Sequence, residues 1–258
     1  MAEWQPLGTS KKAKIDGFFD EKVTFLAGRG CLDARIAEPL KYLHRYRNEA
    51  YHRAKVRPET IRTAALILLE INCQLVLSLH SCGSYASDED YSWIEERFGK
   101  RPFDIMMDGA PVRKEIIDQI RSAVLPTDAS VASTLAKHLE SRLEDLEGAL
   151  GFVTECLESV PDREAALKLS QYNAECERGQ VQPSEYSPVA FTPRWTVKSI
   201  EQLRDRVPEI RGATDRLDAF HRFSLLEVEL EPIESCVHKF ASKVQDMIQM
   251  EIDIRRGK

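Results

Sequence analysis

The residues that most suggest chemistry lie in one stretch, Lys41 to Arg57, which reads KYLHRYRNEAYHRAKVR. Within it an arginine, an asparagine and a histidine stand close together: Arg47, Asn48 and His52. A histidine can take or give a proton near neutral pH, and an arginine stays charged and offers a planar fork of donors to a phosphate. An asparagine beside them can orient the phosphate or fix the imidazole. These residue types together could carry acid–base catalysis at a phosphodiester.

The same stretch reverses the sign of the charge of the chain. The whole sequence has 36 Lys and Arg against 42 Asp and Glu, a net charge of -6, which gives no general attraction to polyanions. Between residues 41 and 57, six basic residues stand against one acid, Glu49, for a local charge of +5. A phosphate-binding surface needs such an excess, because each neutralised phosphate releases counterions. The alternative is that the basic residues only form a solvated helix face.

A helix would place Arg47 on a different face from Asn48 and His52. At ~3.6 residues per turn, Asn48 and His52 lie one turn apart on one face, whereas Arg47 and His52 point ~140° away from each other. For Arg47 and His52 to reach one phosphate, the helix must start or bend nearby, the arginine must curl, or a second copy of the protein must complete the cleft. Arg45 shares the face of His52 and is the reserve candidate for the arginine.

The hexapeptide from Arg47 to His52, RNEAYH, resembles the Arg-Asn-x3-His signature of HEPN domains. These are small helical bundles that include many metal-independent endoribonucleases. The segment Arg216 to His221 also fits the looser Arg-x4-His spacing, but it lacks the asparagine, of which the chain has only three. The resemblance therefore rests on the first match.

The resemblance implies a reaction and an assembly. In that family the arginine and histidine meet at a homodimer interface and cut RNA without a metal or another cofactor, by attack of the ribose 2′-OH, leaving a 2′,3′-cyclic phosphate. On this sequence Arg47 would stabilise the phosphate, His52 would act as general acid or base, and Asn48 would support them. Such proteins commonly act as toxins or in defence against phage, so an antitoxin or a regulatory protein is a further expected partner.

The neighbours of the motif are expected to bind the RNA. Tyr51 could stack on an unpaired base, although packing is the commoner role of an aromatic residue on a helix. The basic residues expected to contact RNA are Lys41, Arg45, Arg53, Lys55 and Arg57. No metal site is expected, because no acidic or cysteine ligand stands on the face that His44 and His52 share.

Composition narrows the class of protein. A chain of 258 residues with 43% hydrophobic and 30% charged residues is typical of a soluble globular protein. Its six cysteines are scattered without a CxxC pair, and no apolar segment at the amino terminus could direct secretion. We therefore expect a reduced, cytoplasmic protein without a zinc knuckle, a disulfide framework or a membrane association.

The periodicity predicts an all-α fold, a HEPN-like up-and-down helical bundle with additional long helices at the carboxyl end. Residues 1–13 read as a flexible tail and residues 14–125 as the HEPN-like helical domain. Its expected helices cover residues 16–27, 34–54, a nearly apolar and centrally buried segment from Pro58, and a segment from Pro111.

Residues 126–258 are expected to form a second helical region, used for dimerisation or partner binding. Thr127 or Asp128 could cap its longest helix, in which apolar residues from Leu139 to Val160 recur in a heptad pattern. We expect this seam to pack against neighbouring helices, because two glycines weaken it. Another helix is expected over residues 162–178. A second seam follows Pro232, and residues 223–232 alternate enough to suggest a strand.

Two other classes of function compete with the ribonuclease. The first is a non-catalytic helical module that binds RNA or protein, with the seam near residues 139–160 as its contact surface. The second is a helical bundle that binds a small ligand or a nucleotide.

Overall fold

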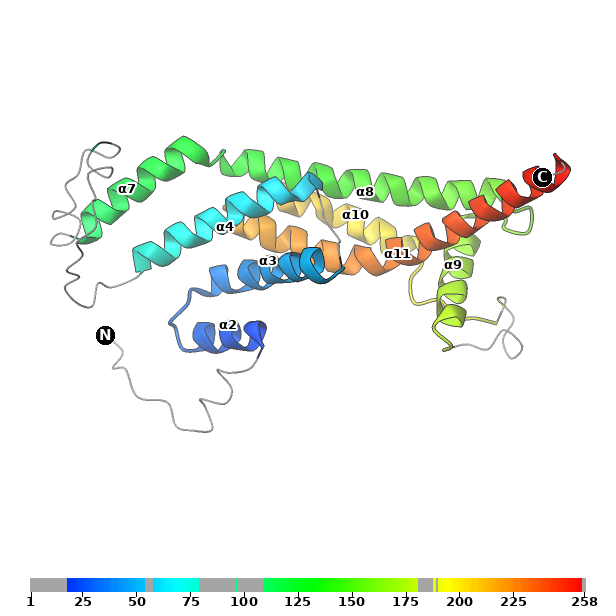
Figure 1. The fold of residues 1–258 in the computed structure, drawn as a ribbon, viewed down its shortest axis with the longest axis horizontal. Helices are drawn as coiled ribbons and strands as arrows, with labels where there is room; N and C mark the ends of the chain where they lie inside the picture. Colours follow the sequence, from blue (N-terminus) through cyan, green and yellow to red (C-terminus); the bar gives the residue numbers. More distant parts are fainter. Residues whose placement is uncertain are drawn as a thin grey trace, which may run out of the picture. The chain divides into compact units, whose positions relative to one another are not determined.

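The computed structural model describes residues 18–53, 58–78, 96, 109–180, 188 and 190–256. In these ranges every secondary-structure element is an α-helix (Figure 1), which confirms the predicted all-α class. The chain divides into two compact units, residues 1–131 with 215–217, and residues 132–214 with 218–258. The division falls inside a helix, six residues beyond the expected domain limit at residue 125. The expected tail, residues 1–13, lies outside the described residues.

The first unit begins with two helices joined by a tight turn, α2 (Phe19–Gly28) and α3 (Ala34–Arg53). Gly30 has a φ of 70° in this turn, a left-handed conformation that an L side chain rarely adopts. The side chain of Asp33 then accepts a hydrogen bond from the backbone N–H of Arg35 at 2.9 Å, which satisfies a free donor at the start of α3. These local signals agree with the helix limits that the sequence predicts.

The first unit continues with α4 (Pro58–Ser78) and α7 (Gly109–Val124), which pack against each other. Ile67 and Ile71 of α4 are fully buried, and between them lies the buried carboxylate of Glu70. Arg121 of α7 donates to both oxygens of Glu70, at 3.1 and 2.7 Å. This two-point ion pair balances the buried charge, which would otherwise be costly.

One segment of α4, Thr60–Ser78, is long and apolar enough to cross a membrane by length and composition, the only such segment in the described ranges. The core helix of a soluble protein can pass the same test, and the structure is compatible with a soluble protein. The predicted central burial of this helix holds only in part, since 33% of the segment is buried. Ile61, Leu68 and Val76 are exposed, whereas Ile67 and Ile71 are fully buried.

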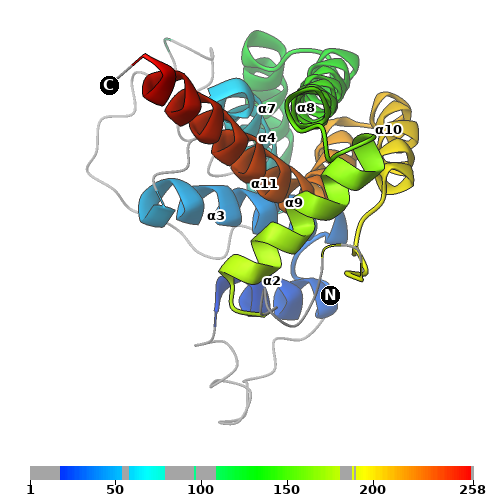
Figure 2. The same ribbon diagram turned by 90° about the vertical axis from the view of Figure 1, so that its right-hand side faces the viewer.

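The described residues of the second unit contain four helices, and the first residues of α8 and of α11 belong to the first unit. They are α8 (Asp128–Cys156), α9 (Arg163–Glu177), α10 (Val197–Arg211) and α11 (Arg216–Arg255). Figure 1 and Figure 2 show α8, α10 and α11 running alongside one another, with α9 crossing at one end.

Side chains cap the amino ends of two of these helices, and the cap at Thr127 was predicted. The hydroxyl of Thr127 accepts a hydrogen bond from the backbone N–H of Ser130 at 3.3 Å at the start of α8. At the start of α9, Asp162 accepts one from Ala165 at 2.8 Å. Both contacts satisfy N–H groups that have no partner inside the helix.

The seam of α8 forms the core of the second unit. Its leucines and Val153 are each at most 1% exposed: Leu139, Leu143, Leu146 and Leu150. Ion pairs join α8 to its neighbours, from Arg204 of α10 to Glu147 at 2.8 Å and from Arg142 to α11. The seam therefore packs inside the unit, as predicted, and it is not an exposed contact surface. The helix ends at Cys156, so that the last positions of the predicted seam follow it.

The strand predicted over residues 223–232 is wrong, because this segment lies inside α11. Its buried apolar residues recur at helical spacing, three or four residues apart: Phe223, Leu226, Leu230, Ile233 and Val237. The apolar residues between them, Leu225 and Val228, are exposed. Pro232 lies within the helix instead of starting it.

Candidate functional site

The carboxyl-terminal end of α3 carries the motif, and this end is exposed. Ile36 and Ala37 in the first turns of α3 are buried against the unit. The burial of the predicted apolar stripe then decreases along the helix, since Leu43 is half-buried and Ala50 is exposed. Residues of the motif that share the outer face are thereby left at the surface.

Arg47 lies on this exposed face beside Tyr51. The guanidinium carbon of Arg47 is 5.1 Å from the ring centroid of Tyr51, a cation–π contact. Tyr51 itself is 78% exposed, so it is not a core residue. Among the described residues no carboxylate pairs with Arg47. The arginine therefore presents its charge to solvent, oriented by an aromatic ring.

Asn48 contacts a different histidine from the one in the motif. Its amide nitrogen lies 2.9 Å from Nε2 of His44, one turn earlier on α3. The His44 ring stacks on Phe19 of α2, with centroids 4.1 Å apart and an interplanar angle of 22°. Asn48 thus supports the contact between α2 and α3.

His52 is exposed one turn beyond Asn48. Within the described part of the chain, no hydrogen bond joins His52 to Asn48 or to Arg47. The structure therefore shows the three motif residues on one helix end without bringing them into contact. A shared substrate or a second subunit would have to bring Arg47 and His52 together.

Two of the predicted RNA-binding residues are paired with carboxylates on their own helix. Lys41 lies 2.7 Å from Glu38, and Arg45 lies 3.8 Å from Glu49. Such pairs are weak where they are exposed, but Glu49 is buried. The positive charge available along this part of α3 is consequently smaller than the sequence suggests.

Arg45 is also held by aromatic rings. Its guanidinium lies 5.5 Å from the ring centroids of both Tyr42 and Tyr46. Burial raises the pKa of Tyr42, the charge of Glu38 raises it further, and Arg45 opposes them. The reserve arginine is therefore less available to a ligand than Arg47.

The remaining predicted RNA contacts cannot be located. Arg53 is the last residue of α3, and its side chain lies outside the described residues, as do Lys55 and Arg57. Their role stays a prediction. In the described ranges no group of three or more His, Cys, Asp or Glu side chains could hold a metal ion.

No protein-family profile, curated protein or solved structure matches the chain. Sequence reasoning missed the role of His44, although one signal was present: His44 precedes Asn48 by the four residues that bring side chains together on a helix.

Proposed function

We propose that the carboxyl-terminal end of α3 binds RNA and cleaves it without a metal, in a homodimer. The observation that supports this proposal most is that Arg47, Tyr51 and His52 are exposed together on the last two turns of α3. A merely structural motif would bury its aromatic residue, and Tyr51 is 78% exposed. The resemblance to HEPN ribonucleases adds the reaction.

Each residue would have a role in the reaction that follows from its chemistry. Arg47 donates to the non-bridging oxygens of the scissile phosphate, where negative charge grows in the transition state. Either His52 takes the proton of the 2′-OH while water protonates the 5′-oxygen, or His52 protonates the 5′-oxygen while water takes the proton of the 2′-OH. The 2′-oxygen forms a bond to phosphorus while the bond to the 5′-oxygen breaks, which leaves a 2′,3′-cyclic phosphate and a 5′-OH. Tyr51 stacks on a neighbouring base.

The helix geometry supports the proposed homodimer. Arg47 and His52 are five residues apart and diverge by ~140° on a regular helix, and both lie within α3. One copy therefore does not direct both groups at one phosphate. A twofold axis beside the exposed helix end would set the arginine of one copy beside the histidine of the other.

Asn48 has a positioning role in this proposal. Through His44 and Phe19 it fixes the end of α3 against α2, and so it holds the surface that carries the two catalytic residues. It need not contact the substrate.

A toxin or a phage-defence effector in the reducing cytoplasm is the biological setting that we propose, with an antitoxin or a regulator as a further partner. The five cysteines in the described ranges are free thiols, in agreement with a reducing compartment.

A non-catalytic RNA-binding module is the second candidate. The contact between Arg47 and Tyr51 would serve RNA binding whether or not His52 transfers a proton. A protein-interaction module that uses the α8 seam has less support, because Leu146 and Leu150 are at most 1% exposed.

RNA binding can be measured by the fluorescence anisotropy of a labelled single-stranded RNA at several salt concentrations. We expect Arg47→Ala to weaken binding and to lower the slope of log K against log[salt] by ~0.7, the value for one lost phosphate contact. Arg255→Ala is the matched control, because that side chain is 82% exposed at the far end of α11. Equal affinities of the two variants would contradict a role of Arg47 in binding.

A further inference from the structure

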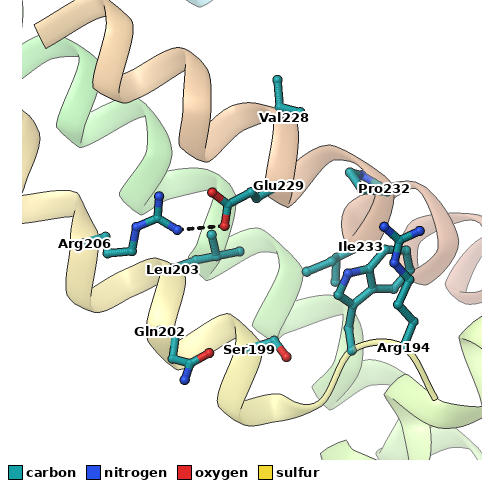
Figure 3. A pocket seen from close by; sticks show the side chains of 10 residues that line it. Arg194, Ser199, Gln202, Leu203, Arg206, Val228, Glu229, Pro232 and Ile233 are labelled. Atoms are coloured by element: carbon teal, nitrogen blue, oxygen red, sulfur yellow. Dashed lines mark hydrogen bonds and ion pairs between the residues drawn. The ribbon is translucent and has the colours of Figure 1, made fainter. Parts of the chain in front are cut away.

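A groove opens in the second unit between α10, α11 and the segment that leads into α10 (Figure 3). Its volume is about 310 Å³, at the small end of the range of small-molecule sites. The apolar residues that line it come from all three segments: Trp195, Leu203, Val228, Pro232 and Ile233. Leu203 and Ile233 are nearly fully buried and give the groove an apolar floor.

A buried glutamine fixes the wall that carries Trp195. The side-chain oxygen of Gln171 in α9 accepts hydrogen bonds from the backbone N–H of Arg194 and Trp195, at 2.8 and 2.9 Å. Its nitrogen donates to the carbonyl of Trp195 at 2.8 Å. Gln171 is only 3% exposed, so water does not compete for these bonds. The wall is therefore formed before any ligand arrives, which reduces the entropy lost on binding.

Pro232 lies in the opposite wall of the groove, which α11 forms, and interrupts the backbone hydrogen bonds of that helix. A proline within a helix has no N–H to donate to the carbonyl four residues earlier, which here belongs to Val228. Both residues line the groove, and Val228 is 43% exposed. The break in the hydrogen-bond ladder of α11 thus coincides with the groove.

Two guanidinium groups border the groove. Arg194 lies 4.9 Å from the ring centroid of Trp195. At the other end, Arg206 of α10 donates to Glu229 of α11 at 2.7 Å (Figure 3). With two cations and one carboxylate around an apolar floor, the groove carries a net charge of +1. It therefore matches a small molecule that has an apolar body and one negative charge.

We propose that this groove binds a small amphipathic anion, with a flat apolar body against Trp195 and Leu203 and a carboxylate, sulfonate or phosphate on Arg206. The anion competes with Glu229 for the guanidinium of Arg206. Every residue that lines the groove lies in the second unit, whereas the proposed ribonuclease residues lie on α3 of the first unit.

The probe for the test is 8-anilinonaphthalene-1-sulfonate, a flat aromatic anion that fluoresces in apolar sites. The full chain is titrated with it, and stoichiometry and Kd are measured. We expect one saturable site, at least fivefold weaker binding by Arg206→Ala, and at least twofold tighter binding by Glu229→Gln, which releases the guanidinium from its carboxylate.

Arg204→Ala is the matched control. It removes the same charge from the same helix, but Arg204 pairs with Glu147 of α8 and does not line the groove. A second test that does not disturb the ion pair is Gln202→Trp, which fills the groove from an exposed position and should abolish binding.

Three results would overturn the proposal. They are the lack of a saturable site, equal binding by Arg206→Ala and Arg204→Ala, and undiminished binding by Gln202→Trp. RNA binding by Arg206→Ala should equal that of the wild type, so that failure of the groove proposal and failure of the α3 proposal are told apart.

Discussion

The amide nitrogen of Asn48 lies 2.9 Å from Nε2 of His44, and His44 in turn stacks on Phe19 of α2. The asparagine of the motif therefore stabilises a contact between two helices. His52, on the other side of Asn48 along α3, stays exposed. Within the motif, Asn48 therefore has a structural role, whereas His52 faces solvent.

Stability measurements can test this separation. Asn48→Ala and His44→Ala should each lower the free energy of unfolding, and the double variant should lose about 0.5–1.5 kcal/mol less than the sum, because both remove the same hydrogen bond. His52→Ala should change stability by less than about 0.5 kcal/mol, as expected for an exposed site. Urea unfolding of the four variants measures these values. Additive losses would contradict the role of the Asn48–His44 contact.

Two glycines should respond to alanine with opposite signs. A Cβ at Gly148, within α8, would meet no atom within 4 Å, so Gly148→Ala should stabilise the protein by about 1 kcal/mol through helix propensity. Gly30 has the same open space but a φ of 70°, so Gly30→Ala should destabilise by about 1 kcal/mol. Thermal unfolding of both variants tests this prediction. A stabilising Gly30→Ala would show that the turn does not require the left-handed conformation.

The ion-pair network in the second unit should be a major determinant of stability. Arg142 donates to Glu227 at 2.9 Å and to Glu234 at 2.9 Å, and Glu227 is fully buried. Burial lowers the pKa of Arg142, but its hydrogen bonds and charge interactions with Glu234 and Glu227 together outweigh that effect and raise it above the ordinary value. Arg142→Met should therefore cost about 3–5 kcal/mol, because it leaves a buried carboxylate without its partner.

The control for that variant is an exposed pair in the same unit. Arg211 donates to both oxygens of Glu140, at 2.8 and 2.7 Å, but both side chains are about 40% exposed. Arg211→Met should cost much less stability than Arg142→Met, because solvent screens an exposed pair. Denaturant unfolding distinguishes the two, and similar losses would mean that burial does not set the strength of the Arg142 network.

Thiol reactivity should depend on pH in a defined direction. Burial raises the pKa of Cys236 to about 11, so that at pH 8 only about a thousandth of this thiol is the reactive thiolate. Its alkylation should be very slow and should quicken about tenfold per pH unit up to pH 11, while the fold persists. Cys31 is exposed and should react first. Iodoacetamide labelling followed by mass spectrometry measures both rates, and equal rates in the native protein would contradict the burial of Cys236.

The helices could be predicted where the spacing of the apolar residues agrees with the capping residues at the helix ends. The seam of α8 and the cap at Thr127 are examples. The strand prediction at residues 223–232 failed because alternating Leu, Val and Glu also fit a helix whose outer face carries apolar residues such as Val228. The interior of α11 also contains Pro232, which local rules place at a helix start.

The partner of Asn48 could not be predicted from spacing. His44 and His52 stand four residues before and after it, and both positions lie one turn away on the same face. The choice depends on Phe19, which comes from another helix and holds the ring of His44. Such a contact is tertiary, and the four-residue spacing alone does not decide between the two histidines.

The groove beside Trp195 could not be predicted from the sequence either. It combines residues from the segment before α10, from α10 and from the middle of α11. One local sign existed, since Thr196 and Ser199 form a reciprocal cap at the start of α10, which marks a fixed chain entry. The contribution of Gln171, from α9, arises only from packing.

Cleavage of RNA tests the proposed function most directly. The wild type and His52→Ala are incubated with total RNA and with tRNA in the presence of EDTA, and the ends of the fragments are identified. We expect the wild type to leave 2′,3′-cyclic phosphate ends and the variant, with its fold and oligomeric state unchanged, to leave the RNA intact. Equal cleavage by the variant, or cleavage that begins only when a metal ion is added, would contradict catalysis by His52.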